Sequence, residues 1–243
     1  ERFLRESRLL VEFDHPNLVK GISFGANGPF HWLAMEFLDG ESIQDTLDRE
    51  NRLSEARALE VILEASQALE YLQSRVILHR DIKPGNIVAL KDGSIKVCDL
   101  GFAQSIGDDA TEGETTSGTA QYMSPEQAME LTLDPRSDLF SLGTLLFHLV
   151  TGQLPFTGSN PSIILRNIIE GNRPGVIELA SDVSGLLADL IEQLLQIEPM
   201  DRPDSARDVA APLARCSEDA GIDPSSEPWS LHSWLIEPNG YED

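Results

Sequence analysis

The spacing of apolar residues divides the first part of the chain into one helix and two strands. Over residues 1–13, apolar side chains recur at roughly helical intervals among charged ones, which predicts an amphipathic helix. The triplet His15-Pro16-Asn17 ends this pattern, because proline cannot continue a helix. Strand-like runs follow at 18–24 and 30–38, and the intervening residues 25–29 are rich in Gly, Asn and Pro, which predicts a turn.

Helical patterns dominate the rest of the chain. Ser42 followed three residues later by Asp45 is a capping-box signal for a short helix, and Ser54 can cap a longer helix with an apolar face. After Cys216 the content of Pro and Ser rises, which predicts a tail on the surface. Further helices are predicted at about 137–150, 160–170, 183–196 and 204–214.

Two segments in the middle of the chain depart from the helical pattern. Short apolar runs at 87–90 and 95–98 flank Lys-Asp-Gly-Ser, and Asp-Gly at such a place predicts a β-hairpin. Residues 104–121 are polar, acidic and rich in Thr and Gly, so we expect a long loop there. Loops of this length inside compact domains are usually functional.

Composition adds one strong constraint, an excess of negative charge. The chain has 41 acidic and 18 basic residues, a net charge of −23, and only four of the basic residues are lysines. Such a surface repels nucleic acid and anionic lipid, so we expect neither a nucleic-acid partner nor membrane contact. A solubility adaptation accounts for the charge more simply than an acidic recognition face does.

The cysteines and the apolar runs indicate a cytoplasmic location. Cys98 and Cys216 form neither a disulfide framework nor a metal-binding spacing, which is typical of a reducing compartment. No signal peptide opens the chain, and the longest apolar stretch, 139–150, is too short to span a bilayer. That stretch predicts a buried helix instead.

The strongest chemical signal is the sequence His-Arg-Asp-Ile-Lys-Pro-Gly-Asn at 79–86. It resembles the catalytic loop of the protein kinases, in which His-Arg-Asp is followed by an Asn five residues after the Asp. Phosphoryl transfer needs a carboxylate to accept the proton of the attacking hydroxyl, and the resemblance assigns this role to Asp81. It assigns Lys83 to offsetting negative charge near the transferred group and Asn86 to supplying an amide oxygen to magnesium.

A second motif of the same family, Asp-Phe-Gly, is matched at 99–101 with Leu in place of Phe. Asp99 would bind the magnesium ions that bridge the phosphates of ATP, because hard cations prefer carboxylate oxygens. The predicted hairpin lies between the two motifs and would bring Asn86 and Asp99 to one end of a two-stranded unit. ATP and Mg²⁺ are therefore the cofactors that the resemblance implies.

Matches to this family continue in order through the second half of the chain. Residues 118–127 (GTAQYMSPEQ) resemble the substrate-docking segment and the Ala-Pro-Glu motif, and they look most like bacterial-type Ser/Thr kinases. Residues 136–143 resemble the buried helix that supports the catalytic loop. By the same resemblance, Arg202 pairs with Glu126, and Lys83 favours Ser/Thr over Tyr as the acceptor.

Upstream, Met-Glu-Phe-Leu at 35–38 resembles the hinge that binds the adenine ring. By resemblance, Met35 is the gatekeeper, and the backbone groups of Glu36 and Leu38 hold the adenine edge. Val88 would pack under the ring. Glu6 matches the helix glutamate that pairs with a lysine on a strand before it.

One part of the family pattern is missing from the sequence. The glycine-rich loop and the Val-Ala-Ile-Lys strand should precede the helix glutamate, but neither they nor any lysine precedes Glu6. We therefore expect an α+β, two-lobed protein-kinase fold from an N-terminally truncated sequence. It would comprise an incomplete amino-terminal lobe at 1–38, a mainly helical carboxyl-terminal lobe at 39–215 and a tail at 216–243. The two strands of the first lobe would form an isolated pair that exposes apolar surface.

The function implied by the resemblance is transfer of the γ-phosphoryl group of ATP to Ser or Thr of a protein substrate. Without the lysine, we expect the chain as given to be inactive. A pseudokinase, acting as a binding or scaffolding module, is the alternative, although the intact Asp81, Asn86 and Asp99 oppose it. A small-molecule kinase of related fold is a further alternative, which the substrate-docking segment opposes.

Activation by phosphorylation of the long loop is a further hypothesis from the sequence. Arg80 can receive a phosphate, and the candidate acceptors in the loop are Thr111, Thr115, Thr116 and Ser117. Gln104, however, stands where many relatives have a basic residue, and the loop carries several acidic side chains. An added phosphate would meet one arginine amid like charges, so its ordering effect would be weak.

Overall fold

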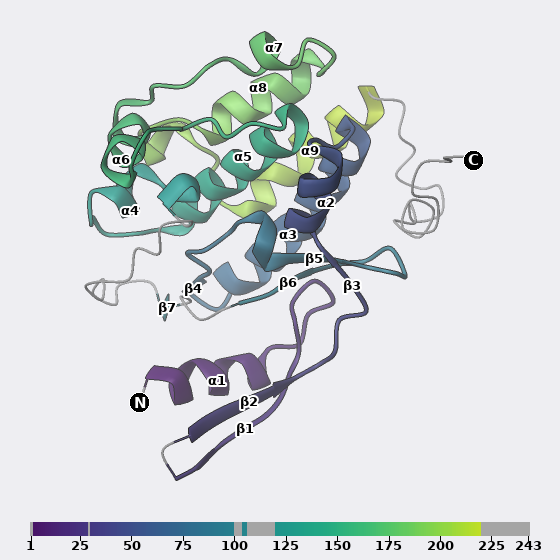
Figure 1. Ribbon diagram of the computed structural model, residues 1–243, viewed down its shortest axis with the longest axis vertical. Coiled ribbons are helices and arrows are strands. Elements are labelled where there is room, and N and C mark those ends of the chain that lie inside the picture. Colours follow the sequence, from purple (N-terminus) through teal and green to yellow (C-terminus); the bar gives the residue numbers. More distant parts are fainter. Residues whose placement is uncertain (1, 29, 100–103, 106–119, 220–243) are drawn as a thin grey trace.

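The chain forms a small amino-terminal unit and a larger helical body. The computed structural model describes residues 2–28, 30–99, 104–105 and 120–219 (Figure 1). In Figure 1, α1 (Arg2–Glu12), β1 (Gly21–Asn27) and β2 (Phe30–Met35) lie together at one end, while the other helices gather at the opposite end. We call these three elements the amino-terminal unit. The α+β, two-part architecture confirms the fold class expected from the sequence.

β1 and β2 form an antiparallel hairpin on which α1 packs. Asn27 lies opposite Phe30 at the turn, and Gly21 lies opposite Met35 at the other end. The apolar stripe of the predicted amphipathic helix continues just past its end, where Phe13 is buried in the core. The helix and the isolated two-stranded pair were therefore both predicted correctly.

The predicted ends of the two strands were wrong. The first strand begins at Gly21 rather than at 18, and the second ends at Met35 rather than at 38. Residues 17–19 instead bond to β6 (Ile95–Val97), because Val97 N–H donates to the Asn17 carbonyl (2.8 Å) and Val19 N–H donates to the Val97 carbonyl (3.0 Å). The backbone groups of residues 17 and 19 are thus bonded to β6, so this segment does not extend the β1–β2 hairpin.

The amino-terminal unit exposes large apolar side chains, as the sequence predicted. Phe30 is 74% exposed and Phe37, just after β2, is 89% exposed; Ile22 and Trp32 are also exposed. Among the described residues, no third strand joins β1 and β2. A two-stranded hairpin is marginally stable by itself, so the packing of α1 and the anchoring of residues 17–19 must hold this unit together.

A three-stranded sheet of order β3-β5-β6 lies at the edge of the helical body. β5 (Ile87–Leu90) and β6 are the two strands of the predicted hairpin, and Gly93 in its turn has a left-handed φ of +93°. β3 (Gly40–Ser42) was not predicted, because three residues carry too little alternation. Gly40 is required there, since an added Cβ would lie 2.0 Å from the Ala89 carbonyl oxygen.

The helical body is built around α5, which is buried along most of its length. The helices predicted from periodicity and caps are all present, and α9 continues past the expected end at 214. Two further helices of four residues each, α4 and α7, were not predicted because so short a segment has no periodicity. Among the described helices, none is long and apolar enough to cross a membrane. Their bounds are α2 (Ile43–Glu50), α3 (Glu55–Gln73), α4 (Pro125–Ala128), α5 (Pro135–Thr151), α6 (Pro161–Glu170), α7 (Val176–Leu179), α8 (Gly185–Leu194) and α9 (Ala206–Asp219).

Two short strands and three 3₁₀ turns complete the described part of the fold. Strands β4 (Ile77–Leu78) and β7 (Gln104–Ser105) pair antiparallel on either side of the hairpin in the sequence. Single 3₁₀ turns occur at Pro84–Asn86, Ala120–Tyr122 and Pro199–Asp201. Most of the predicted long loop and of the predicted tail lie outside the described residues.

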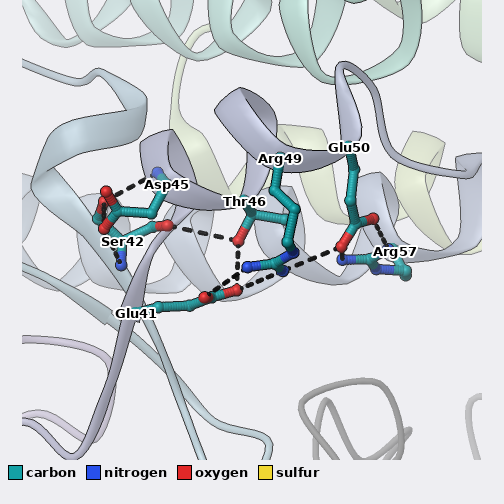
Figure 2. Close-up of polar contacts among 7 residues, drawn as sticks. All are labelled: Glu41, Ser42, Asp45, Thr46, Arg49, Glu50 and Arg57. Atoms are coloured by element: carbon teal, nitrogen blue, oxygen red, sulfur yellow. Dashed lines mark hydrogen bonds and ion pairs between the residues drawn. The ribbon is translucent and has the colours of Figure 1, made fainter. Parts of the chain in front are cut away.

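A polar network joins β3, α2 and α3 (Figure 2). The predicted capping box is present, since Asp45 N–H donates to Ser42 Oγ (3.1 Å) and the Asp45 carboxylate accepts the Ser42 N–H (3.3 Å). Beside it, Glu41 accepts two hydrogen bonds from the Arg49 guanidinium, at 2.8 and 2.7 Å. Arg49 also bonds to Glu50, which pairs with Arg57 on α3. The network ties the strand beside β5 to two helices.

Glu60 on α3 gives the domain a pH-dependent stability. Burial, aided by the charge of Glu64 one turn away, raises the pKa of Glu60 to about 7. Because this exceeds the pKa of about 4.3 in an unfolded chain, the contribution of Glu60 is most favourable below about pH 4 and is lost as the pH rises to about 7. Glu60→Gln should therefore stabilise the domain at pH 8, by about 1 kcal/mol after allowance for partial exposure, and change little at pH 4.

Urea unfolding at the two pH values measures this difference. Glu70→Gln is the matched control on the same helix, since Glu70 makes an exposed pair with Arg207 and should change stability little at either pH. Equal effects of Glu60→Gln at pH 4 and pH 8 would contradict the assignment.

Candidate active site

The catalytic loop predicted at 79–86 is anchored to α5 by one buried carboxylate. The Asp138 carboxylate accepts the backbone N–H groups of His79 (2.9 Å) and Arg80 (2.8 Å). Burial raises the pKa of Asp138, although His79 and these hydrogen bonds partly offset that effect. Arg80 has a left-handed φ of +67°, which is strained for a residue with a side chain. The two hydrogen bonds hold the loop in this conformation.

His79 connects the catalytic loop to the residue before Asp99. Its imidazole is fully buried, and burial lowers its pKa, so the ring is neutral at pH 7. Nδ1 accepts the Asp81 N–H (3.3 Å), which places the ring proton on Nε2, and Nε2 then donates to the Cys98 carbonyl (3.1 Å). The His79 ring therefore links the first motif, to which it belongs, to the residue that precedes the second.

The Asp81 carboxylate is buried and held through one of its two oxygens. Oδ2 accepts hydrogen bonds from Lys83 Nζ (2.6 Å) and Asn86 Nδ2 (2.8 Å). Oδ1 is also buried and has no hydrogen-bond partner among the described residues. A buried oxygen of this kind is costly unless something else bonds to it. The structure therefore brings Asp81, Lys83 and Asn86 together, as the sequence predicted, and leaves one acceptor available.

Asn86 and Asp99 lie at the same end of the β5–β6 hairpin. Cys98 N–H donates to the Asn86 carbonyl (2.8 Å), which continues the ladder by one step past Ile87 opposite Val97. Asn86 Nδ2 also donates to the Asp81 carbonyl (2.9 Å), so the amide oxygen, the atom suited to a hard cation, faces away from Asp81. Asp99 is exposed. One carboxylate with one amide oxygen suits Mg²⁺, which takes its remaining ligands from water and phosphate.

The predicted adenine-binding residues lie where the two parts of the molecule join. Residues 36–39 run from β2 directly into β3, and Leu38 O accepts the Gly40 N–H (3.1 Å). Val88 on β5 lies opposite Ser42 on β3. Glu36 N–H donates to the Lys20 carbonyl (2.9 Å), so its amide is used within the protein. Met35, the last residue of β2, is half exposed.

Several predicted residues lie outside what the structure describes. They include the side chain of Glu6, the docking residues Gly118 and Thr119, and Leu100 and Gly101 of the second motif. The four candidate phosphorylation sites, Thr111, Thr115, Thr116 and Ser117, also fall there.

The predicted pair of Glu126 and Arg202 is present and fully enclosed. Arg202 donates to both carboxylate oxygens, at 2.7 and 3.0 Å, and Ser137 Oγ donates to one of them at 2.7 Å. Burial alone would raise the pKa of Glu126, but the bonds from Arg202 outweigh it and the pKa is lowered. The remaining guanidinium hydrogens reach the carbonyls of Gln196, Arg136 and Ile197.

Sequence reasoning missed one residue that supports the loop. Gln127 Nε2 donates to the Arg80 carbonyl (3.0 Å), and its Oε1 accepts the Ser124 N–H (2.9 Å) in a capping box. Ser-x-x-Gln at 124–127 is a recognisable signal for this cap, whereas the bond to Arg80 has no signal in the sequence. Cys98 is partly buried against the hydrophobic core, and burial raises the pKa of its thiol to about 12.

Comparison with known proteins places the chain among the kinases. The model of the protein kinase domain family matches residues 1–212. A serine/threonine-protein kinase PknB of Mycolicibacterium smegmatis is 34% identical over 224 residues, covering 89% of this chain and 36% of that protein. PknB of Mycobacterium tuberculosis is 36% identical over 225 residues, covering 88% of this chain and 35% of that protein.

A probable serine/threonine-protein kinase of Clostridium perfringens is 31% identical over 228 residues, covering 93% of this chain and 33% of its own length. The chain thus spans about a third of the length of these curated relatives. A family match over most of the chain agrees with the two-part fold and with the geometry around Asp81. The chain therefore belongs to the protein kinase domain family.

Proposed function

We propose that this domain transfers the γ-phosphoryl group of ATP to Ser or Thr side chains of a protein substrate. The observation that carries the proposal is the Asp81 carboxylate, with Oδ2 held by Lys83 and Asn86 and Oδ1 accepting no hydrogen bond from the described residues. An oriented carboxylate with one available oxygen suits a general base. The nearby Lys83 ammonium supplies positive charge beside it.

In the proposed reaction, the substrate hydroxyl oxygen attacks the γ-phosphorus while its proton passes to Asp81. The new bond joins oxygen to phosphorus, and the bond from phosphorus to the β–γ bridging oxygen breaks, so that ADP leaves with that electron pair. Lys83 offsets negative charge on the transferred group. The protein mainly positions the reactants, because the transition state is loose.

The nucleotide would be held by residues from both parts of the molecule. Met35 and the backbone of Glu36 and Leu38 would border the adenine ring, with Val88 beneath it. Asn86 and Asp99 would hold Mg²⁺, which supplies neutralising charge to the phosphates when it is bound. In the family pattern the glutamate at the place of Glu6 pairs with a lysine that precedes it and contacts the phosphates. In this sequence no lysine precedes Glu6.

Composition supports the proposed partners and location. A net charge of −23 is unfavourable for nucleic acid and anionic membrane, so the proposed partner is a protein substrate. Cys98 and Cys216, both within the described residues, are not joined in a disulfide, which suits a reducing compartment such as the cytoplasm.

The test uses this chain alone and a polypeptide extended by the coding sequence upstream of Glu1. Both are incubated with labelled ATP and Mg²⁺, and with either a protein substrate or small alcohols and aminoglycosides. We expect the extended polypeptide to label Ser or Thr of the protein, and the chain alone to label nothing. Labelling of the small molecules alone would indicate a small-molecule kinase, and nucleotide binding without any labelling would indicate a pseudokinase.

A further inference from the structure

Lys96 joins three segments of the chain through one ammonium group. Its Nζ donates to the Glu36 carboxylate (2.8 Å) and to the Leu18 carbonyl (3.2 Å). Only 14% of the Lys96 side chain is exposed, so this interaction is shielded from solvent. Lys96 itself lies on β6, and that strand leads directly to Asp99.

Glu36, the partner of Lys96, is held at its side chain and its backbone. Its Oε1 accepts the Lys20 N–H (2.8 Å) as well as the Lys96 ammonium, and its own N–H donates to the Lys20 carbonyl (2.9 Å). Burial opposes ionisation of this carboxylate, but the hydrogen bonds from Lys96 and Lys20 outweigh it, and the pKa of Glu36 is lowered. Glu36 is therefore an anion at neutral pH, and its bond to Lys96 is charge-assisted.

The other acceptor of Lys96 belongs to a segment that is fixed to the helical body. Asn17, next to Leu18, is buried, and its Nδ2 donates to the Glu64 carboxylate on α3 (2.6 Å). Its carbonyl accepts the Val97 N–H from β6. Leu18 therefore belongs to a segment that is bonded to both α3 and β6, and Lys96 links Glu36 to that segment.

We propose that Lys96 is a positioning residue for the nucleotide, which fixes the backbone of residues 36–38 relative to the end of β6 that carries Asp99. The inference rests on the proposed function, because it takes these two places as the adenine edge and the metal ligand. They belong to different parts of the molecule, and one nucleotide must reach both. A link that holds residues 36–38 at a fixed distance from Asp99 lowers the conformational entropy that nucleotide binding would otherwise cost.

Lys91 provides a matched comparison on the same hairpin. Its Nζ lies 2.8 Å from Asp39 Oδ1, so it also pairs with an acid of the segment between β2 and β3. That pair is open to solvent, with 66% and 64% of the two side chains exposed. Exposed ion pairs of this kind contribute little, so removing Lys91 should leave the nucleotide site unchanged.

The test measures dissociation constants of adenosine and of Mg²⁺·ADP by calorimetry on the full chain. Lys96→Met should weaken both ligands about tenfold, the scale of a lost hydrogen bond to a charged group, and Lys91→Met should stay within about twofold of wild type. Glu36→Gln keeps the shape of its side chain and loses the charge, so it should weaken both ligands in the same direction. The double variant should bind no worse than Lys96→Met, because the two residues act as a pair.

Thermal unfolding of each variant separates positioning from general stability. A purely structural role would lower the unfolding midpoint of Lys96→Met and leave both dissociation constants of the folded protein unchanged, which overturns the proposal. If Lys96→Met does not fold, Glu36→Gln carries the same comparison. Wild-type chain that binds neither ligand overturns the proposed nucleotide site and this inference with it, whereas equal binding by wild type and Lys96→Met overturns this inference alone.

Discussion

Replacing Asp81 by Asn should lower the rate of phosphoryl transfer by about 10²–10⁴-fold without unfolding the domain. Asn has the same shape, and its amide oxygen can occupy the place of Oδ2 and still accept hydrogen bonds from Lys83 and Asn86. Its NH₂ group would take the place of Oδ1, which accepts no hydrogen bond from the described residues. The substitution removes the proton acceptor and preserves the surrounding contacts.

The rate of phosphoryl transfer is measured in the polypeptide extended upstream of Glu1. Nucleotide binding and thermal unfolding of the same variants are measured in parallel. Binding of Mg²⁺·ADP should change little, because Asp99 and Asn86 are untouched. Asp92→Asn is the matched control: Asp92 accepts the Ser94 N–H (3.0 Å) in the hairpin turn, away from Asp81, and its replacement should leave the rate near that of wild type. An Asp81→Asn variant as fast as wild type would remove the basis of the proposed mechanism.

Replacing Arg202 by Met should destabilise the domain by about 3–5 kcal/mol. The substitution leaves the buried Glu126 carboxylate without its cation and also removes the donors that reach three backbone carbonyls. A buried ion pair adds little over an apolar pair, but an unpaired buried charge is very unfavourable. The loss should appear in urea unfolding as a lower midpoint with an unchanged slope.

Two further variants show whether the unpaired charge is the cause. Adding Glu126→Leu to Arg202→Met removes the stranded carboxylate, so the double variant should be more stable than Arg202→Met alone. Arg166→Met is the exposed control, since its pair with Glu170 lies on the surface of α6 and should contribute under about 0.5 kcal/mol. A double variant that is less stable than the single one would show that the lost donors, rather than the charge, dominate.

Local signals in the sequence predicted most of the helices and the hairpin correctly. Ser54 caps α3 by accepting the Arg57 N–H, and Ser42 with Asp45 forms the capping box before α2. A cap, a turn and an apolar period each depend on residues a few positions apart, so they are visible in the chain itself. The predicted Glu126–Arg202 pair spans a long separation, and it was foreseen only through the family resemblance.

The sequence by itself determined most of the segments that are helical, and it predicted, through the family resemblance, which side chains the chemistry would use. The tertiary structure alone decided that residues 17–19 bond to β6, that the amide of Asn86 turns its nitrogen to Asp81, and that Lys96 meets Glu36. The contacts of residues 17–19 and of Lys96 join residues far apart in the chain, and none of the three leaves a period, cap or turn that could be read from the sequence. They follow from how the packed elements meet, where buried polar groups must find partners.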